Sequence, residues 1–528
     1  MNATREGAWT PLRHPVFRAL WLAALISTIG SWMQTVGAQW LLLDQPHAST
    51  LVALVQTASS LPILLFALPA GVLAEFLDRR LILLGAQAFQ TAVGVALVLL
   101  THAGQMSPPL LLLLTFLLGA GAAAQLPAYQ ALIPDLVPTR ELTSAAALGS
   151  ISVNIARAIG PAIAGLLISS LGVTFVFAIN TATFAVFFVV LVVVRVPSPR
   201  QSLSAEGFLA GLAAGGRYTR HAPVVRRILL RLVLFLVPAN VLWALLAVLA
   251  SQRLGLGASG YGVLLALLGI GSVVGAALLP RLRTRVGPNV LIAGSSMVYA
   301  ITLSALATVR SSAIAGLLLL TGAAWIAVIA TLNAATQTFL PAWVRARGLS
   351  IYQLVLFGTT AVASLAWGVI ADAIGVAPTF AIAAVLLAAT ALTIRIWPLL
   401  DTAGLSRLPV EAEHNPTIRL PKDEQLGPVV VTVTYTIARD PEGFMALAGR
   451  LRNSRLRTGG RGWRLLRDGE NPQCFVETFT VASLAEHQLQ QTARLTGADQ
   501  AVIQSARDFS QPPPAVAHLF LAPTGHDR

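Results

Sequence analysis

Twelve stretches of about 20 mostly apolar residues follow one another along the first 400 residues, and they constrain the fold more than any other feature. A helix needs about 20 residues to cross the hydrocarbon core of a bilayer, and its backbone hydrogen bonds must be satisfied within it. The sequence therefore predicts an all-α polytopic membrane protein with 12 transmembrane helices. The predicted spans are 17–43, 50–76, 81–103, 109–132, 142–170, 173–195, 226–251, 259–280, 288–309, 312–338, 346–371 and 376–400.

The composition excludes several other classes of protein. Charged residues make up 11% of the chain, against about 25% in soluble proteins. The mean hydropathy of +0.73 is far too high for an ordinary soluble enzyme or a disordered chain. A single cysteine, Cys474, leaves nothing from which to build an internal disulfide framework.

The net charge of +14 at first suggests a nucleic-acid-binding protein, but its distribution indicates otherwise. Residues 1–400 contain 22 Arg and 8 acidic residues, whereas residues 401–528 contain 14 basic and 14 acidic residues. The excess lies entirely in the apolar part, so no nucleic-acid partner is expected. The jump in charge density after residue 400 indicates that a soluble domain follows the membrane part.

Arginines are distributed unequally between the two sides of the predicted spans. Alternate connections contain only Arg253 and Arg310, and the remaining connections contain nearly all the others, from Arg5 to Arg395. The positive-inside rule then places both termini and the long connection 196–225 in the cytoplasm. The first span is expected to act as the targeting signal in place of a cleavable signal peptide.

The twelve spans divide into two sets of six, which suggests an internal repeat. The segments QALIPDLVPTREL (130–142) and QTFLPAWVRARGL (337–349) each join the fourth span of a half to the fifth and share five identities, including Arg140 and Arg347. The expected organisation is a six-helix half, a cytoplasmic connection with an amphipathic helix at 206–220, a second half, a linker and a soluble domain. Their ranges are 1–195, 196–225, 226–400, 401–427 and 428–522.

The segment GVLAEFLDRR (71–80), at the cytoplasmic end of the second span, is a candidate gating loop formed by Gly71, Glu75, Asp78, Arg79 and Arg80. Glycine allows two helices to approach closely, and carboxylates pair strongly with guanidinium groups. We expect the two acids to pair with the two arginines in one conformation and to release them in another. The alternative is an ordinary cytoplasmic loop, which explains the arginines but not the glycine and the acids.

The predicted fifth span contains the motif Asn154, Arg157, Gly160, Pro161 and Gly165. Glycine and proline allow the helix to bend and to pack closely against a neighbour. An arginine at the centre of a span costs about 2.5–3.5 kcal/mol on insertion scales, so Arg157 is expected to face a wet cavity or a partner. Two hypotheses remain open: a cavity cation that contacts a ligand, and a structural arginine bonded to Asn154 or to backbone carbonyls.

Polar side chains also lie within spans of both halves. Each alone is most often a helix–helix hydrogen bond, but as a set they are candidates for lining a central cavity. The candidates are Gln34, Gln56, Asn240, Asn333 and Gln337. Asp372, near the outer end of the eleventh span, is expected to be an interfacial acid rather than a proton carrier. The sequence does not separate tryptophans that anchor the membrane interface from tryptophans that line a cavity.

The C-terminal region predicts an α+β domain. Strands are expected at 428–438, 462–468, 473–481 and 515–522, with helices at 440–457 and 483–495. This βαββαβ order predicts a ferredoxin-like plait. Glu477 and His487 are expected to have a paired structural role, because no nucleophile, base and metal ligands converge on them.

These features together resemble the major facilitator superfamily. The segments 17–42 and 127–165 resemble the bacterial branch that includes the enterobactin exporter and transmembrane secretion effectors, and the tail resembles small monooxygenase-like plaits. The loop 71–80 departs from the superfamily motif at Glu75, Phe76 and Asp78, and Ala164 replaces a glycine of the fifth-helix antiporter motif. The first span has no acid at its centre, so the resemblance does not identify the coupling group.

The resemblance implies a secondary active exporter of a small molecule, such as a siderophore or a drug, in the bacterial cytoplasmic membrane. Alternating access around a midplane site is expected, with a proton as the coupling partner. No catalytic residue, cofactor or metal site is expected, and the absence of a G-x-x-x-x-G-K-[ST] sequence argues against direct use of ATP. The alternative is a membrane sensor that signals through the C-terminal domain. That domain is expected to regulate or dimerise the protein.

Overall fold

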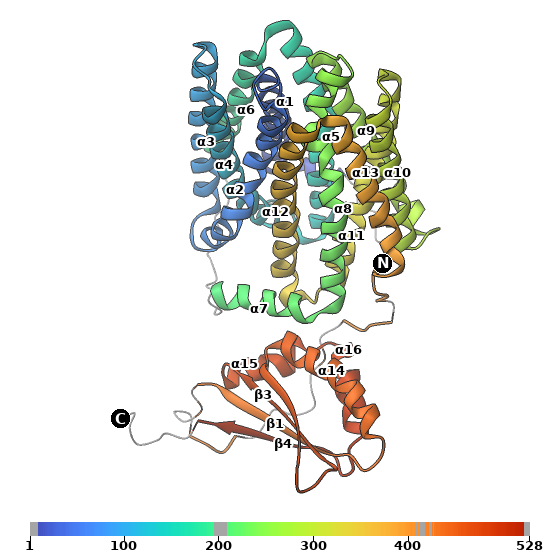
Figure 1. Cartoon of the computed structure of the whole chain (residues 1–528). Coiled ribbons are helices and arrows are strands. Elements are labelled where there is room, and N and C mark those ends of the chain that lie inside the picture. Colours follow the sequence, from blue (N-terminus) through green and yellow to red (C-terminus); the bar gives the residue numbers. More distant parts are fainter. Residues whose placement is uncertain are drawn as a thin grey trace. The chain divides into compact units, whose positions relative to one another are not determined.

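The computed structural model describes residues 9–194, 208–402, 404–407, 410, 418–421, 425 and 427–521. The side chains of residues 67–68, 70–76, 208–213 and 312 lie outside this description. Within the described ranges, 12 helices are long and apolar enough to cross a membrane, which confirms the predicted number of spans. They run side by side as a bundle (Figure 1).

Six of these helices precede the long connection and six follow it. The first six are α1 (Pro15–Leu41), α2 (Ala48–Phe76), α3 (Arg79–His102), α4 (Pro108–Leu136), α5 (Leu142–Leu171) and α6 (Val173–Val193). The second six are α8 (Pro223–Val248), α9 (Ala258–Arg283), α10 (Pro288–Thr308), α11 (Leu317–Phe339), α12 (Ala342–Ile374) and α13 (Val376–Leu392). Between them lies α7 (Phe208–His221), close to the predicted amphipathic helix.

Short helical turns flank or connect several spans: η1 (Thr10–Arg13), η2 (Thr139–Glu141), η3 (Leu249–Arg253), η4 (Ser312–Gly316) and η5 (Thr393–Arg395). The predicted last span is too long, because α13 ends at Leu392 rather than near residue 400. The chain passes through η5 and then reaches Pro398, and a residue that precedes proline is sterically disfavoured in the α conformation.

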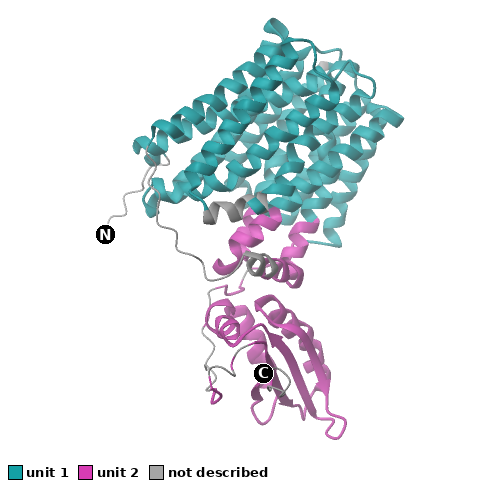
Figure 2. Cartoon of the chain, turned by 90° about the vertical axis from the view of Figure 1, so that its left-hand side faces the viewer, with its two compact units in different colours: residues 1–203, 231–332, 353–398 teal, residues 204–230, 333–352, 399–528 magenta. Residues whose placement is uncertain are grey.

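The chain forms two compact units, coloured separately in Figure 2. Unit 1 comprises residues 1–203, 231–332 and 353–398, and so contains most of the membrane helices. Unit 2 comprises residues 204–230, 333–352 and 399–528. It therefore joins α7, the α11–α12 connection and the C-terminal domain. The predicted limits of the two halves, the linkers and the C-terminal domain, at residues 195, 225, 400 and 427, stay predictions. The two units are defined by packing contacts and do not test those positions.

Within unit 1, the two halves meet along two pairs of helices whose backbones nearly touch. A Cβ atom on Gly165 of α5 would lie 2.5 Å from the carbonyl oxygen of Ala258 in α9, and one on Gly262 would lie 2.6 Å from that of Pro161. On the other side, a Cβ on Gly368 of α12 would lie 2.6 Å from the Cβ of Ala53 in α2. Glycine at these positions permits the close packing that joins membrane helices.

Several polar contacts between the halves lie near the end of the bundle that carries the α1–α2 connection. The Asp372 carboxylate of α12 accepts hydrogen bonds from the backbone N–H groups of Ser49 (3.2 Å) and Thr50 (3.0 Å) in the first turn of α2. Near the same end, the Tyr261 hydroxyl of α9 donates to Gln39 Oε1 of α1 over 2.5 Å. The two halves are thus joined at this end, which the predicted topology places outside the cell.

The C-terminal domain is the predicted ferredoxin-like plait. Its strands β1 (Val429–Thr436), β2 (Arg461–Arg467), β3 (Cys474–Val481) and β4 (Ala515–Phe520) form an antiparallel sheet in the order β2-β3-β1-β4. Its helices are α14 (Pro441–Thr458), α15 (Leu484–Leu489), which continues as η6 (Gln490–Arg494), and α16 (Gly497–Asp508).

Helix α16 was not predicted, although its start carries a recognisable signal. Thr496 and Asp499 form a capping box, in which each side chain accepts from the backbone N–H of the other residue. Side-chain N-caps also begin the other two helices of the domain: Asp440 accepts from the Gly443 N–H at 2.9 Å, and Ser483 accepts from the Glu486 N–H at 3.1 Å.

Candidate functional site

The Arg157 guanidinium of α5 lies against two neighbouring tryptophans from different halves of the protein. Its Cζ lies 5.6 Å from the ring centroid of Trp32 on α1 and 5.8 Å from that of Trp243 on α8. The two ring centroids are 5.9 Å apart. Desolvated cation–π contacts of this kind contribute up to about 2 kcal/mol. The charge is therefore fixed where helices of the two halves meet.

Hydrogen-bond donors at this site are unused. Among the described residues, the buried Nε and Nη1 of Arg157 and the Nε1 of Trp243 have no hydrogen-bond partner. Asn154 does not supply one, since its Nδ2 donates to the Ser150 carbonyl oxygen at 2.9 Å and its Oδ1 is itself unpartnered within the described part of the chain. Buried donors are normally satisfied, so these N–H groups are suited to bind an anionic or carbonyl-bearing ligand.

Arg231 of α8 shows how a structural arginine differs. Its side chain is fully buried and donates to the Trp397 carbonyl oxygen at 2.7 Å, to the Thr393 carbonyl oxygen at 2.6 Å and to the Thr393 hydroxyl at 3.0 Å. Its Nη1 also donates to the Thr390 carbonyl oxygen at 3.2 Å. Arg231 thus ties α8 to the end of α13, a role the sequence analysis did not foresee because the residue lies in an apolar run.

An aromatic cluster continues from Trp243 through other helices of the second half. Trp243 and Trp325 have ring centroids 5.5 Å apart, and Trp325 lies 5.7 Å from Phe235 and 6.4 Å from Tyr299. Rings at these distances form a rigid apolar surface. Trp32, Trp243 and Trp325 are therefore aromatics of the bundle interior, and only their tertiary contacts distinguish them from interfacial anchors.

The predicted cavity residues bond to separate partners. In unit 1, Gln34 accepts from Asn180 at 3.4 Å, and Asn240 donates to the Ser364 hydroxyl at 2.6 Å. Gln56 contacts Ser60 of its own helix at 3.5 Å. Within the described atoms, Gln34 Nε2 and Asn240 Oδ1 remain unpartnered, so both could still bind a ligand. In unit 2, Gln337 Nε2 donates to Asn333 Oδ1 at 3.1 Å. Their role in lining a cavity stays a prediction.

The candidate gating loop has described partners on neighbouring helices, and its predicted internal pairs stay a prediction. Asp78 is the N-cap of α3 and accepts from the backbone N–H of Arg80 at 2.8 Å. The Arg79 guanidinium pairs with Asp135 of α4 at 2.6 Å, and the Arg80 guanidinium donates to the Leu191 carbonyl oxygen of α6 at 2.9 Å. The loop therefore ties together three helices of the first half. The side chain of Glu75 and the surroundings of Gly71 lie outside the description.

The two repeat-related segments occupy corresponding positions, with 130–142 between α4 and α5 and 337–349 between α11 and α12. Arg140 lies in η2, next to Glu141, whose buried carboxylate is 3.0 Å from His14 Nε2. Within unit 2, α7 packs on the start of α12, because a Cβ on Gly215 would lie 2.9 Å from the Cβ of Arg347. The second segment therefore has a neighbour from the long connection.

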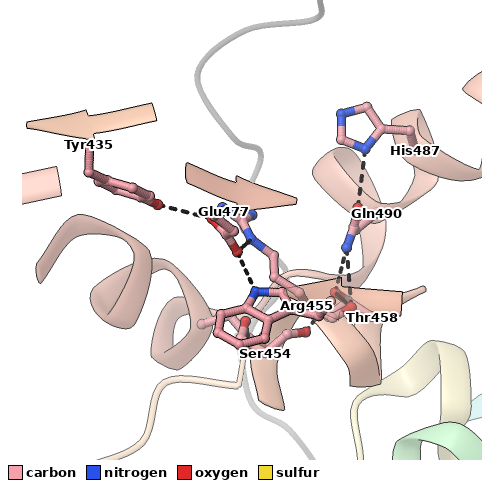
Figure 3. A network of polar contacts seen from close by, with 9 residues as sticks. Tyr435, Ser454, Arg455, Thr458, Glu477, His487 and Gln490 are labelled. Atoms are coloured by element: carbon pink, nitrogen blue, oxygen red, sulfur yellow. Dashed lines mark hydrogen bonds and ion pairs between the residues drawn. The ribbon is translucent and has the colours of Figure 1, made fainter. Parts of the chain in front are cut away.

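Glu477 of β3 is fully buried at the centre of a polar network in the C-terminal domain (Figure 3). Its carboxylate accepts from Trp463 Nε1 at 2.8 Å, from Arg455 Nε at 3.0 Å and from the Tyr435 hydroxyl at 3.0 Å. Burial alone would lower the pKa of Arg455, but the Glu477 carboxylate outweighs it and raises that pKa. These contacts agree with the structural role expected for Glu477.

His487 joins the same network through Gln490 rather than through Glu477. Its Nδ1 lies 3.1 Å from Gln490 Oε1, and Gln490 Nε2 reaches the Arg455 carbonyl oxygen at 3.5 Å (Figure 3). Its Nε2 lies 3.1 Å from the Nε2 of His518 on β4, a partner that the sequence analysis missed.

Comparison with known proteins identifies the class. The family described as transmembrane secretion effector matches residues 6–523, so the chain belongs to that family. It is a multi-pass membrane protein of the major facilitator superfamily, a superfamily of transporters rather than enzymes. The bundle resembles a bacterial homolog of the human lysosomal transporter Spinster, with a TM-score of 0.56 and 16% identity over 73% of this chain and 95% of the other. It also resembles the nucleoside transporter NupG, with a TM-score of 0.57 and 12% identity over 73% of this chain and 100% of the other. At these identities the likeness shows the fold alone.

Three relatives match over part of their length. The staphyloferrin A transporter of Staphylococcus aureus is 30% identical over 27% of this chain and 36% of its own. The macrolide efflux protein A of Streptococcus pyogenes is 25% identical over 34% of this chain and 45% of its own. The multidrug efflux pump Tap of Mycobacterium tuberculosis is 27% identical over 48% of this chain and 66% of its own. The matched stretches thus cover from about a third to about two thirds of these relatives.

Proposed function

We propose that this protein exports an acidic, partly aromatic small molecule across the bacterial cytoplasmic membrane by alternating access. The observation that carries the proposal is the Arg157 guanidinium, which lies against Trp32 and Trp243 and has buried N–H groups without a hydrogen-bond partner among the described residues. A planar cation suits a carboxylate or catecholate-like group, and the flanking rings suit an apolar body. The named activities of the relatives, which include efflux, support the direction of transport.

The proposed cycle starts from a conformation in which the halves are joined at the outer end. Two contacts hold that end together. The Asp372 carboxylate of α12 accepts from the first turn of α2, and the Tyr261 hydroxyl donates to Gln39. Substrate enters from the cytoplasm and binds at Arg157, and the halves then rock so that the outer contacts open. Both termini lie in the cytoplasm in this scheme, as the arginine distribution indicates. A reporter fused to residue 528 that is active only in the periplasm would exclude this orientation.

Proton coupling fits the same scheme through Asp372. A proton from outside would neutralise this carboxylate and weaken its hold on the α2 N-terminus, since a charged acceptor makes the stronger hydrogen bond. Opening of the outer end would then follow protonation. Asp372 thus becomes the candidate coupling group that the sequence analysis did not identify.

Transport assays with matched compounds test the proposal. Cells with and without the gene would be loaded with acidic compounds, among them catecholate and carboxylate siderophores, and with their neutral esters or amides. Lower accumulation of the acidic members only when the protein is present is expected. Equal accumulation of acidic and neutral members in both strains would contradict export of this class.

A second candidate function is a membrane sensor that signals through the C-terminal domain. Within unit 2, Arg494 lies over the Trp343 ring of α12 at 4.9 Å from its centroid, and Arg217 of α7 is 3.9 Å from Glu486. These contacts link the domain to the α11–α12 connection. Deletion of residues 401–528 separates the two functions: an exporter keeps some transport, whereas a sensor loses its output and shows no transport with or without the domain.

A further inference from the structure

Gln39 of α1 is buried and bonds to two helices of the second half, one of which carries a wall of the Arg157 site. Its Oε1 accepts from the Tyr261 hydroxyl of α9 at 2.5 Å, and its Nε2 donates to the backbone carbonyl oxygen of Trp243 in α8 at 3.5 Å. The first bond is short, whereas the second is at the outer limit of hydrogen-bond length. One amide group of the first half is thus bonded to both α8 and α9.

The Trp243 carbonyl fixes the orientation of the Gln39 amide. A carbonyl oxygen only accepts hydrogen bonds, so the NH2 group of Gln39 has to face it. The Gln39 oxygen must then face Tyr261, whose hydroxyl donates to it. If Trp243 moves away, the amide is no longer held in this orientation, and the Tyr261 hydroxyl loses its fixed acceptor. The longer bond therefore controls the shorter one.

Gln39 lies on the same face of α1 as Trp32, the other tryptophan of the site. The two residues are seven positions apart, which is two helical turns and a rise of roughly 10 Å. Gln39 is nearer to the α1–α2 connection, so it lies on the outer side of the indole rings. Trp40 stacks on Tyr261, with ring centroids 6.4 Å apart and planes inclined at 19°. These three side chains lie between the indole rings and the outer end.

The indole rings leave no room for a further ring between them. Trp32 and Trp243 have ring centroids 5.9 Å apart and planes inclined at 49°. A third ring packed between two others needs about 7–8 Å, because carbon atoms in contact are about 3.5–4.0 Å apart. The aromatic part of a ligand that enters between these rings therefore has to push α1 and α8 apart.

Helix α8 is the one that has to move, because α1 is packed directly on α5. A Cβ atom on Gly160 of α5 would lie only 2.8 Å from the Trp32 Cβ. Such close backbone packing holds α1 and α5 together. Trp32 and Arg157 therefore stay in place, and Trp243 moves away from them and from Gln39.

We propose that Gln39 is the positioning residue through which a ligand at Arg157 opens the outer end. This role depends on the function proposed above, and it fixes the order of events. The aromatic part of the substrate separates the two indoles, the 3.5 Å bond from Gln39 breaks, and the bond from Tyr261 follows. Only hydrogen bonds break in this sequence, and no covalent bond changes.

A contact that opposes entry of the ligand also weakens its binding, because the coupling between two sites is reciprocal. In the closed form, the ligand binds only by breaking the Gln39 bonds. Removal of these bonds should therefore open the outer end without a ligand and also raise the affinity for the ligand. A side chain that served only to stabilise the fold would give no such gain in affinity.

The test uses the full-length protein in phosphatidylcholine nanodiscs, with spin labels at positions Gln45 and Arg310 in a Cys474→Ser background. Both labelled positions are exposed and belong to opposite halves. The probes are 2-naphthoate and its neutral counterpart 2-naphthamide. Distance distributions are measured with and without each probe. Affinity is measured by equilibrium dialysis, with empty nanodiscs subtracted.

Two variants break the proposed link. Gln39→Met removes both bonds at nearly constant volume, and Tyr261→Phe removes one of them and keeps the ring. Tyr299→Phe is the matched control, because Tyr299 is also fully buried and its hydroxyl donates to the Ala239 carbonyl oxygen at 3.0 Å within the second half. The control loses the same group without changing a contact between the halves.

Without a probe, Gln39→Met and Tyr261→Phe should populate the long distance about three- to tenfold more than the wild type, as expected for the loss of neutral hydrogen bonds. The distances of Tyr299→Phe should match those of the wild type. 2-Naphthoate should lengthen the wild-type distance. It should bind Gln39→Met about three- to tenfold more tightly than the wild type and change the distance of that variant less.

Unchanged affinity for 2-naphthoate in Gln39→Met, or an equal shift of the distances in Tyr261→Phe and Tyr299→Phe, would overturn the role of Gln39. So would a wild type whose distances respond to neither probe. A wild type that binds both probes equally, with distances that respond to both, would contradict an acidic substrate and leave the role of Gln39 intact. Failure of the proposed substrate class is thereby distinguished from failure of the Gln39 link.

Discussion

The carboxylate of Asp372, near the end of α12, accepts a hydrogen bond of 3.0 Å from the backbone N–H of Thr50 in the first turn of α2. The two residues belong to different halves of the protein, so a helix N-terminus of one half is capped by an acid of the other. The positive end of the α2 dipole adds to the attraction. We call this contact, with its second bond to Ser49, the outer latch.

Asp372→Asn is expected to open the outer latch. A neutral amide oxygen makes a weaker hydrogen bond than a carboxylate by roughly 1–2 kcal/mol, which shifts a two-state equilibrium by about five- to thirtyfold. Spin labels at the exposed Gln45 and Arg310 connections, in a Cys474→Ser background, would report a longer distance population. Asp44→Asn, an exposed acid at the same end, is the control and should change nothing.

If Asp372 also couples transport to protons, the distance distribution of the wild type should shift toward the open form as the outer pH falls. The Asp372→Asn variant should show no such shift, because an amide does not titrate in this range. A variant that responds to pH like the wild type would remove Asp372 as the coupling group.

Arg157→Gln is expected to reduce transport of acidic substrates by about tenfold or more, with little change in thermal stability. The variant loses a charged donor, which contributes about 1.5–3 kcal/mol to a hydrogen bond with an anion. Arg157→Lys keeps the charge and loses the planar fork, so an intermediate effect is expected. Transport per folded molecule and melting temperature would be measured together.

Arg231→Gln serves as the matched control for Arg157, since both are arginines within membrane helices. Its donors are bonded to the Thr390, Thr393 and Trp397 backbone, so the variant should lower the melting temperature and the yield of monodisperse protein. If Arg157→Gln behaves in the same way, Arg157 is structural and the substrate-contact hypothesis is wrong.

Asp135→Asn is expected to slow transport more than Asp78→Asn. The first substitution removes the ion pair with Arg79, whereas asparagine at position 78 still caps α3. Transport rates normalised to surface expression would distinguish the two. A larger effect at Asp78 would contradict this expectation and would support gating by ion pairs within residues 71–80.

Acidification is expected to destabilise the C-terminal domain between about pH 6.5 and pH 4. Burial and His518 lower the pKa of His487 to about 4 in the folded state, so the unfolded chain takes up a proton first as the pH falls. At about 1.4 kcal/mol per pKa unit, the loss is of the order of 3 kcal/mol. Hydrogen exchange of residues 484–495 at pH 7 and pH 4, corrected for the intrinsic exchange rates, would measure it, and His487→Gln should flatten the pH dependence.

The hydropathy of this sequence determined the number and approximate limits of its membrane helices, because each span has to satisfy its backbone within about 20 apolar residues. Alternation and capping residues likewise predicted the plait of residues 428–522. Local patterns such as these depend on neighbours in the chain, and for this reason the missed helix α16 still carried a readable capping box at Thr496 and Asp499.

Tertiary structure alone decided the partners of the polar side chains. Arg157 and Arg231 are both arginines in apolar helices. Within the described part of the chain, Arg157 lies against two tryptophans with unused donors, whereas Arg231 donates to four acceptors on α13 and the segment after it. Arg79 pairs with Asp135, 56 residues away, a partner that the sequence did not predict. Asp372 accepts a hydrogen bond from Thr50, which is 322 residues away in the sequence. A one-dimensional pattern contains the types and spacings of these residues, but distances between helices arise only when the helices pack.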